Sequence, residues 1–218
     1  MSETVAEARP DTSEAVALHQ VFRDALESAS DLVAGAVVER PEAQEAVAGY
    51  YGNVLAFLRA HHEAEDAALW PRLRERCPDE GIVPAVVSGH EALDGTLTRA
   101  EHALVQFSTE PTAQWGGHLV GALLTLQFEL EALVSTQERD ILPLAAEHLS
   151  VEEWAEITPL AFAAFGGDRP WLVLGLVLDA STEAQAASLL ERLPEDVRAA
   201  WQGEDQARYE TFLAELRG

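Results

Sequence analysis

Residues 61–71, HHEAEDAALWP, hold the densest group of side chains in this chain that could bind a metal ion or transfer a proton. His61 and Glu65 are four residues apart, so on a helix they share one face and lie about 6 Å apart along its axis. The same face carries apolar residues such as Leu58 and Leu69, which predicts that both polar groups point into a core. Burying an imidazole and a carboxylate is costly unless a partner satisfies them. In helical proteins that partner is often a metal ion held by inward Glu and His side chains.

Two more histidines strengthen this interpretation. His19 and His90 lie on or beside the apolar stripes of two other predicted helices, roughly level with His61 if the helices alternate in direction. Three imidazoles and one carboxylate suit iron, zinc or manganese, and ligand type alone does not select among them. His62 lies about 100° around the helix from its neighbour, so we expect it at the rim.

A second stretch, LVSTQERDILP at 133–143, is an altered copy of the first. When the two are aligned on their closing prolines, Leu133 falls opposite His61 and Gln137 opposite Glu65. Leucine cannot bind a metal, and a neutral amide is a poor substitute for a bridging carboxylate. The sequence therefore keeps one half of a two-part ligand set.

Apolar residues recur at helical spacing through most of the chain. Four long helices are predicted over residues 12–39, 41–71, 86–110 and 112–147, with a break at 77–81. No stretch alternates with period two, so we expect an all-α protein in which residues 1–148 form an antiparallel up-down-up-down four-helix bundle.

The remaining residues, 149–218, predict a helical extension. Ser150 and Glu153 have the spacing of a capping box, and shorter helices are expected over 171–180, 182–192 and 195–216. The apolar side chains of this tail need cover, which the outside of the bundle can provide. We therefore expect the extension to form part of the same structural unit.

The charge balance limits the partners. The chain has 38 acidic and 14 basic residues, a formal net charge of −24, which disfavours nucleic acid and anionic membranes and leaves a small molecule as the expected partner. The longest apolar run, residues 171–178, is far shorter than the ~20 residues of a membrane span. One cysteine and an acidic start without a signal-peptide pattern predict a cytoplasmic protein.

These motifs resemble those of hemerythrin-like, or HHE cation-binding, domain proteins. The resemblance is carried by His19-Gln20-Val21-Phe22-Arg23, His61-His62-x-x-Glu65-Asp66-x-x-Leu69-Trp70-Pro71, Gly89-His90-Glu91 and Ile141-Leu142-Pro143-Leu144. The stretch from His148 to Trp154 also resembles that of bacterial, especially actinobacterial, members.

The resemblance implies a four-helix bundle with a non-haem di-iron centre, in which the second and fourth helices each give His-x-x-x-Glu. Such proteins bind or sense dioxygen, respond to nitric oxide or peroxide, or repair or store iron. Four residues match ligand positions of the family, and they are His19, His61, Glu65 and His90. Leu133 and Gln137 do not match, so a standard di-iron site is not expected.

Two metal-bound arrangements remain open. In the first, the four matching residues hold a single ion of iron or another divalent metal. In the second, Asp94 and Glu129, each one helical turn from a ligand position and displaced toward the same end of the bundle, join a rebuilt site. Arg23 lies at that end too, so both carboxylates have an ion pair as their simpler explanation.

A metal-free protein is the alternative. Leu133 would then open an apolar pocket beside Glu65, whose pKa burial would raise, and Glu65 with His61 would be a catalytic acid–base pair for a small apolar molecule. A third hypothesis is a protein without an active site, whose acidic surface and Trp-rich tail bind other proteins. The leading hypothesis is an altered, non-di-iron metal site for small-molecule redox, dioxygen or nitric oxide chemistry.

Overall fold

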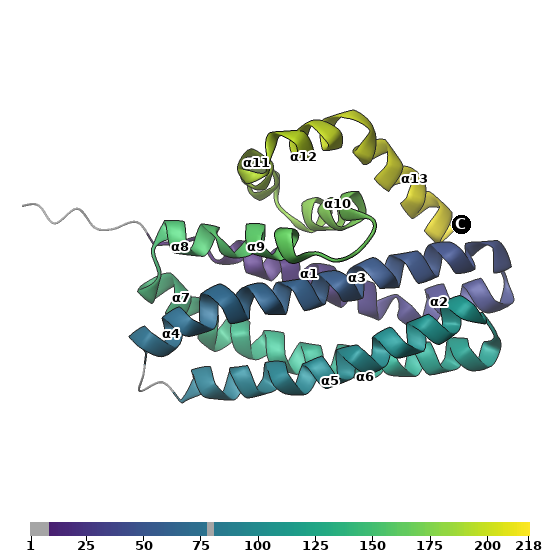
Figure 1. The fold of residues 1–218 in the computed structure, drawn as a ribbon, viewed down its shortest axis with the longest axis horizontal. Coiled ribbons are helices and arrows are strands. Elements are labelled where there is room, and N and C mark those ends of the chain that lie inside the picture. Colours follow the sequence, from purple (N-terminus) through teal and green to yellow (C-terminus); the bar gives the residue numbers. More distant parts are fainter. Residues whose placement is uncertain (1–8, 78–80) are drawn as a thin grey trace, which may run out of the picture.

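Every secondary-structure element in the described part of the chain is a helix, as Figure 1 shows. The computed structural model describes residues 9–77 and 81–218, and the all-α prediction is confirmed there. In chain order the first elements are α1 (Ser13–Glu27), α2 (Ala29–Val38), η1 (Pro41–Ala43), α3 (Gln44–Ala64), η2 (Glu65–Leu69), α4 (Trp70–Arg76), α5 (Ile82–Thr109), α6 (Ala113–Thr136), η3 (Gln137–Ile141) and α7 (Leu142–His148). The rest are α8 (Val151–Ala155), α9 (Ile157–Ala164), α10 (Pro170–Ala180), α11 (Glu183–Arg192), α12 (Glu195–Ala200), η4 (Trp201–Asp205) and α13 (Gln206–Arg217).

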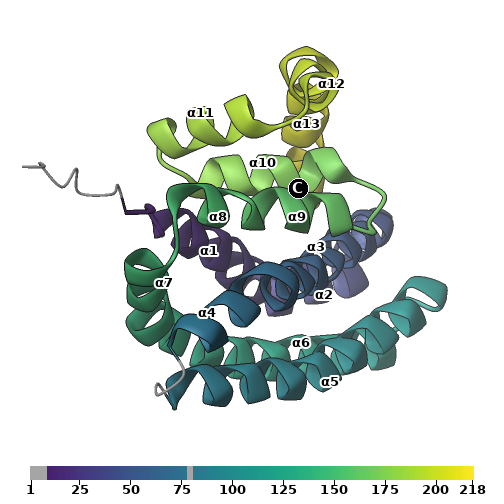
Figure 2. The same cartoon turned by 60° about the vertical axis from the view of Figure 1, so that its left-hand side comes forward.

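The long helices lie side by side around the main core. Helix α5 contacts α6 and α3, and α6 also contacts α1 and α2 (Figures 1 and 2). Each helix turns an apolar stripe inward, as α6 does with Leu119, Leu123, Leu126 and Leu130, all at most 1% exposed. This packing fixes the rotation of each helix and hence the direction of the polar side chains on the same stripe.

The helix that contains α6 is unusually apolar. The continuous stretch Ala113–His148 is long and apolar enough, by length and composition, to cross a membrane. Its leucine stripe belongs to the core, while Leu124 and Phe128 on another face are exposed. A core helix passes the same test of length and composition, so the stretch is weak evidence for a membrane span.

The first predicted helix is two helices. It is interrupted at Ser28, where the hydroxyl donates to the Ala25 carbonyl at 2.9 Å and the Tyr51 hydroxyl donates to the same oxygen at 3.0 Å. The sequence has no Gly or Pro at this point, so the break was not predicted. The predicted break at 77–81 lies partly outside the described residues.

Two prolines do not end their helices. Pro71 lies in the first turn of α4, so the helix predicted to bend or end there runs on to Arg76, and Pro143 sits in the same way in α7. A proline inside a helix lacks an N–H and its ring crowds the carbonyl four residues back. The chain accommodates each ring with a π-helical segment, η2 and η3, just before it. These segments begin at Glu65 and Gln137, the equivalent positions of the internal repeat.

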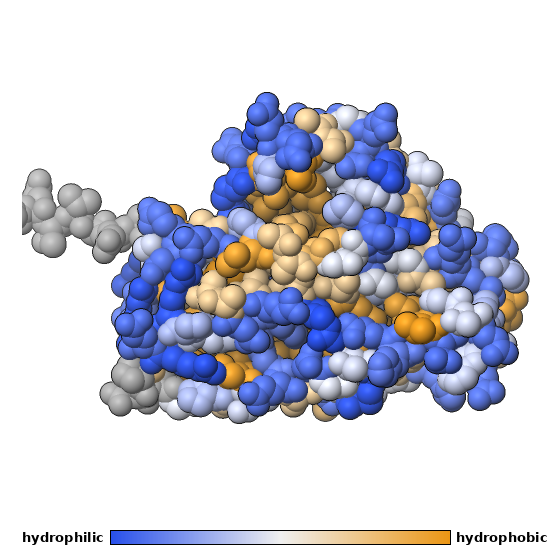
Figure 3. Space-filling view, viewed as in Figure 1, coloured by the Kyte–Doolittle hydropathy of each residue, from blue (hydrophilic) through white to orange (hydrophobic). Residues whose placement is uncertain are grey.

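The C-terminal helices cover the face formed by α1 and α3. Helix α9 contacts α3, α10 contacts α1 and α3, and α13 contacts α10 and α3 (Figure 2). The predicted tail helices match α10, α11 and the stretch from α12 to α13 closely, and the capping box of Ser150 and Glu153 is present. Hydrophilic side chains dominate the rim of the view in Figure 3, with an apolar area over α9 and α10.

Candidate metal centre

Three buried side chains from α1, α3 and η2 converge in the core. Ligand atoms of His19, His61 and Glu65 all lie within 4.8 Å of one another. The residues are only 1%, 3% and 4% exposed. Within residues 9–77 and 81–218, no other group of three His, Cys, Asp or Glu side chains comes together this closely. The sequence predicted that these three residues converge together with His90, and His90 is not part of the group.

His19 is held in one orientation by a carboxylate that the sequence did not point to. Its Nδ1 lies 2.9 Å from Oε1 of Glu138, and Arg23 donates to the same oxygen at 2.8 Å. When Nδ1 carries the proton, the lone pair of the imidazole is on Nε2. That Nε2 is buried and has no hydrogen-bond partner in the part of the chain that the structure describes. A carboxylate behind a histidine, with the other nitrogen left free, is the usual support of a metal-binding imidazole.

The charge states of His61 and Glu65 also suit the binding of a cation. Burial lowers the pKa of His61 to about 4, against the opposing charge of Glu65, so the imidazole is neutral at pH 7. Burial alone would raise the pKa of Glu65, but the neighbouring imidazoles and a hydrogen bond with His90 outweigh it and hold this pKa below its ordinary range. The expectation of a raised pKa is therefore wrong. A neutral imidazole and an ionised carboxylate, 3.6 Å apart here, are the protonation states in which these groups bind metals.

His90 reaches the same carboxylate from the opposite side, together with Gln137. Nε2 of His90 lies 3.1 Å from Oε2 of Glu65, and the amide nitrogen of Gln137 lies 3.0 Å from each of these two atoms. When Nε2 of His90 carries the proton, this nitrogen and one N–H of the Gln137 amide both donate to Oε2 of Glu65. The two donors therefore occupy an oxygen that would otherwise be free to bind a second ion.

Leu133 occupies the position of the internal repeat that is equivalent to His61. Its Cδ1 would lie 3.0 Å from a Cβ added at Gly89, so the glycine leaves room for the leucine. Leu133 lines an apolar cleft of about 380 Å³ between α5 and α6, with Phe128 and Val86 among its other walls. Neither Glu65 nor His61 is part of this lining, so the cleft does not join an apolar surface to the predicted acid–base pair.

The two additional carboxylates are not brought together. Asp94 forms an ion pair with Arg59 and is 60% exposed, and Glu129 accepts a hydrogen bond from Thr96. Each carboxylate is thus held by a different partner, and the prediction that they meet is wrong.

Arg23, the predicted ion-pair partner of Asp94 and Glu129, pairs with other carboxylates. Arg23 pairs with Glu131 and Glu138, at 2.7 and 2.8 Å, and not with Asp94 or Glu129. Arg23 thereby orients the carboxylate behind His19. The pairing depends on the rotation of α1 against η3, which residue spacing within one helix does not reveal.

His62 lies deeper than predicted. It is 8% exposed, and its ring centroid lies 4.4 Å from that of His90. It still lines a cleft at the surface, so its place at the rim is correct while its burial was missed.

No family model matches this chain, and neither a curated protein nor a solved structure matches it. These comparisons therefore identify no family, and membership of the hemerythrin-like proteins stays a prediction from the sequence motifs.

Proposed function

We propose that residues 1–148 form a hemerythrin-like, antiparallel four-helix bundle that holds one divalent metal ion, with residues 149–218 as an extension packed on it. In this proposal His19, His61 and Glu65 are the ligands, and the function is redox or gas-binding chemistry on a small molecule in the cytoplasm. The single cysteine fits a reducing compartment. The order of the long helices and their mutual contacts support the bundle.

One observation carries the proposal. Three buried side chains from three separate elements each offer a ligand atom within 4.8 Å of the others, and Nε2 of His19, on the ring that Glu138 orients, has no hydrogen-bond partner among the described residues. A buried polar atom without a partner is costly, so an arrangement that holds one in place needs an explanation. A cation among the three ligands provides it.

The donor set favours iron among the candidate metals. Two imidazoles and one carboxylate are typical of non-haem ferrous sites that keep coordination positions open for a substrate. Iron bound to such a set supplies redox chemistry on dioxygen, nitric oxide or a similar small molecule. The chain itself excludes bulk water by burying the ligands and keeps Glu65 ionised through His90 and Gln137.

The same geometry favours one ion over two. Gln137 provides N–H donors where a second centre would need a carboxylate, and Leu133 provides no ligand at all. Of the predicted ligands, His90 is thereby assigned to holding Glu65. The metal-free acid–base alternative is less well supported, because the apolar cleft at Leu133 does not include Glu65 or His61.

Metal analysis of protein purified from cells supplied with iron tests the proposal. We expect close to one iron per chain in the wild type and almost none in His61→Ala. His102→Ala is the matched control, because this exposed imidazole lies outside the cluster and its loss should leave the iron content unchanged. A wild type that binds no metal under these conditions, or equal iron in His61→Ala, would contradict the proposal.

A further inference from the structure

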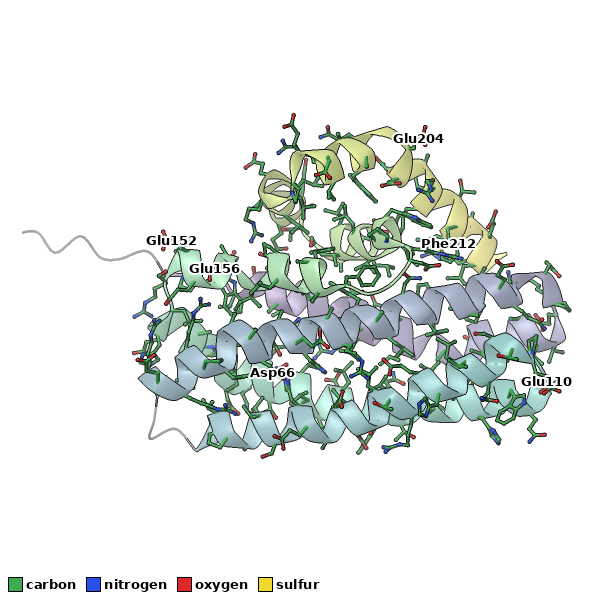
Figure 4. The ribbon with its side chains drawn as sticks, viewed as in Figure 1. Asp66, Glu110, Glu152, Glu156, Glu204 and Phe212 are labelled. Carbon is green, nitrogen blue, oxygen red and sulfur yellow. The ribbon has the colours of Figure 1, made fainter. Side chains whose placement is uncertain are left out.

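A polar cleft of about 490 Å³ lies between α5 and the continuous helix of α3, η2 and α4. Its inner wall is formed by two imidazoles, those of His62 and His90, and its outer part includes Glu63, Asp66 and Glu91. In Figure 4, Asp66 lies beside α3 and α4, on the side toward α5. The cleft thus leads from the surface to the residues that adjoin the candidate metal centre.

His90 separates the cleft from the centre and offers a nitrogen to each. Its Nε2 lies 3.1 Å from Oε2 of Glu65 on the inner side. Its Nδ1 lies 3.9 Å from Oδ1 of Asp66, a residue of the cleft. The imidazole is only 4% exposed, and Nδ1 is buried without a hydrogen-bond partner. A buried, unpartnered nitrogen directed toward a carboxylate of the cleft points to a ligand there.

The other groups of the cleft indicate the class of ligand. Imidazoles next to carboxylates form a donor set for divalent transition metals. Two arginines also line the cleft: the guanidinium of Arg59 is paired with Asp94 and Glu101, and the charge of Arg74 acts on Asp66. Asp66 is 60% exposed and can meet a hydrated ion from solution.

The cleft is looser than the inner centre. Its side chains do not converge as tightly as His19, His61 and Glu65, whose ligand atoms lie within 4.8 Å of one another. An ion held by fewer protein atoms keeps more of its water and exchanges faster. Weak binding and fast exchange are the properties of a site that binds an ion transiently before it reaches the inner centre.

We infer that this cleft is a loading site, a second and weaker divalent-cation site at which Asp66 and Nδ1 of His90, 3.9 Å apart, hold a hydrated ion before it passes to the inner centre. The inference rests on the proposed function, because it supplies the route by which the buried ligands acquire their metal.

Stopped-flow loading of the metal-free full-length protein with Co²⁺ tests this site, with the visible absorbance of the bound ion as the readout. In the wild type the loading rate should rise with Co²⁺ concentration and then level off as the cleft fills. In Asp66→Asn the concentration that gives half the maximal rate should rise at least about tenfold. Asp31→Asn removes the same charge from an exposed position on α2 and should behave as the wild type.

An unchanged half-saturating concentration in Asp66→Asn, or a wild-type rate that stays linear throughout, would overturn the loading site while leaving the inner centre intact. If the wild type takes up no inner ion, the proposed function fails, and the cleft is then tested alone by Co²⁺-induced broadening of the ring NMR signals of His62 and His90. Broadening that Asp66→Asn abolishes supports a cation site, and an absence of broadening in the wild type overturns it.

Discussion

The amide nitrogen of Gln137 lies 3.0 Å from a carboxylate oxygen of Glu65, although the two residues are 72 positions apart in the chain. They occupy equivalent positions of the internal repeat, and each begins a π-helical segment that precedes a proline. The pair therefore joins the two halves of the internal repeat through a hydrogen bond. Three predictions test the candidate metal centre, and two more test how the C-terminal extension is attached.

Replacing the Gln137 amide by a carboxylate should make the free energy of unfolding depend on bound metal. Gln137→Glu places two buried carboxylates about one hydrogen-bond length apart, so we expect the free energy of unfolding to fall by about 2–4 kcal/mol without metal. Added Fe²⁺ or Co²⁺ should recover most of that loss, because a cation compensates the second charge. Urea denaturation with and without metal measures both effects. Gln106→Glu, on an exposed face of α5, is the control, and equal behaviour of the two variants would count against a bridging position.

Restoring both altered positions should raise the metal stoichiometry. Leu133→His with Gln137→Glu returns an imidazole and a carboxylate to the second half of the ligand set, next to His90. Native mass spectrometry should then detect two ions per chain, against one in the wild type and one in Leu133→His alone. A double variant that folds but still binds one ion would show that other groups limit the second half-site.

Glu138 acts as a positioning residue for His19. Glu138→Gln removes the charge that holds Nδ1 of the imidazole at 2.9 Å, so metal affinity should fall about 10- to 100-fold. The absorption spectrum of bound Co²⁺ should also shift, since the imidazole can then rotate. Glu131→Gln is the matched control, because Glu131 pairs with Arg23 but makes no contact with His19 among the described hydrogen bonds. Equal affinities in both variants would refute the positioning role.

The junction of α8 with α4 should weaken in acid. Hydrogen bonds from Arg76 and from the backbone N–H of Ser150 lower the pKa of Glu153 to about 2. Its unfolded pKa is about 4.3, so the stabilisation is fully present above about pH 4.5 and is lost as the pH falls toward 2. Glu153→Gln should cost about 0.5–1 kcal/mol at pH 7 because the pair is partly exposed. Urea denaturation from pH 7 to pH 3 should show this difference shrinking, whereas exposed Glu191→Gln should show no difference at either pH.

The tail should depend on one buried amide. Asn53, only 2% exposed, donates to the Gly49 carbonyl and to Asp168 and accepts from the backbone N–H of Arg169, all within 2.9 Å. Asn53→Ala leaves the partly buried backbone N–H of Arg169 without its partner and removes two further hydrogen bonds, so we expect a loss of about 2–3 kcal/mol. Asp168→Ala removes only one of these bonds at an exposed side chain and should cost less than about 1 kcal/mol. A loss in Asn53→Ala no larger than in Asp168→Ala would show that the amide does not anchor the tail.

Much of the architecture could be predicted from residue spacing. Period-3.6 stripes locate the helices because burial of one face fixes the pattern, and turn residues locate the ends of the tail helices. The same stripes placed His19, His61, His90 and Glu65 at one level of the core, and the structure brings together all of these except His90, which instead contacts Glu65 from α5. Inward polar residues on separate helices are informative because each would be costly alone.

Other features depend on geometry that spacing within one helix does not contain. The π-helical segments before Pro71 and Pro143 shift the register by a residue, a response to ring crowding that a regular helix template omits. Asp94 and Glu129 do not meet because each has a different partner, Arg59 and Thr96, which the spacing from a ligand position does not reveal. Glu138 was missed because its contact with His19 depends on how two distant elements are rotated against each other.

Anomalous diffraction from crystals of the wild-type protein grown with Fe²⁺ tests the central claim most directly. The account predicts a single iron peak per chain, within bonding distance of Nε2 of His19, His61 and Glu65, with the amide of Gln137 still hydrogen-bonded to the carboxylate. Two iron peaks per chain, or no peak at these three side chains in protein exposed to excess iron, would contradict it.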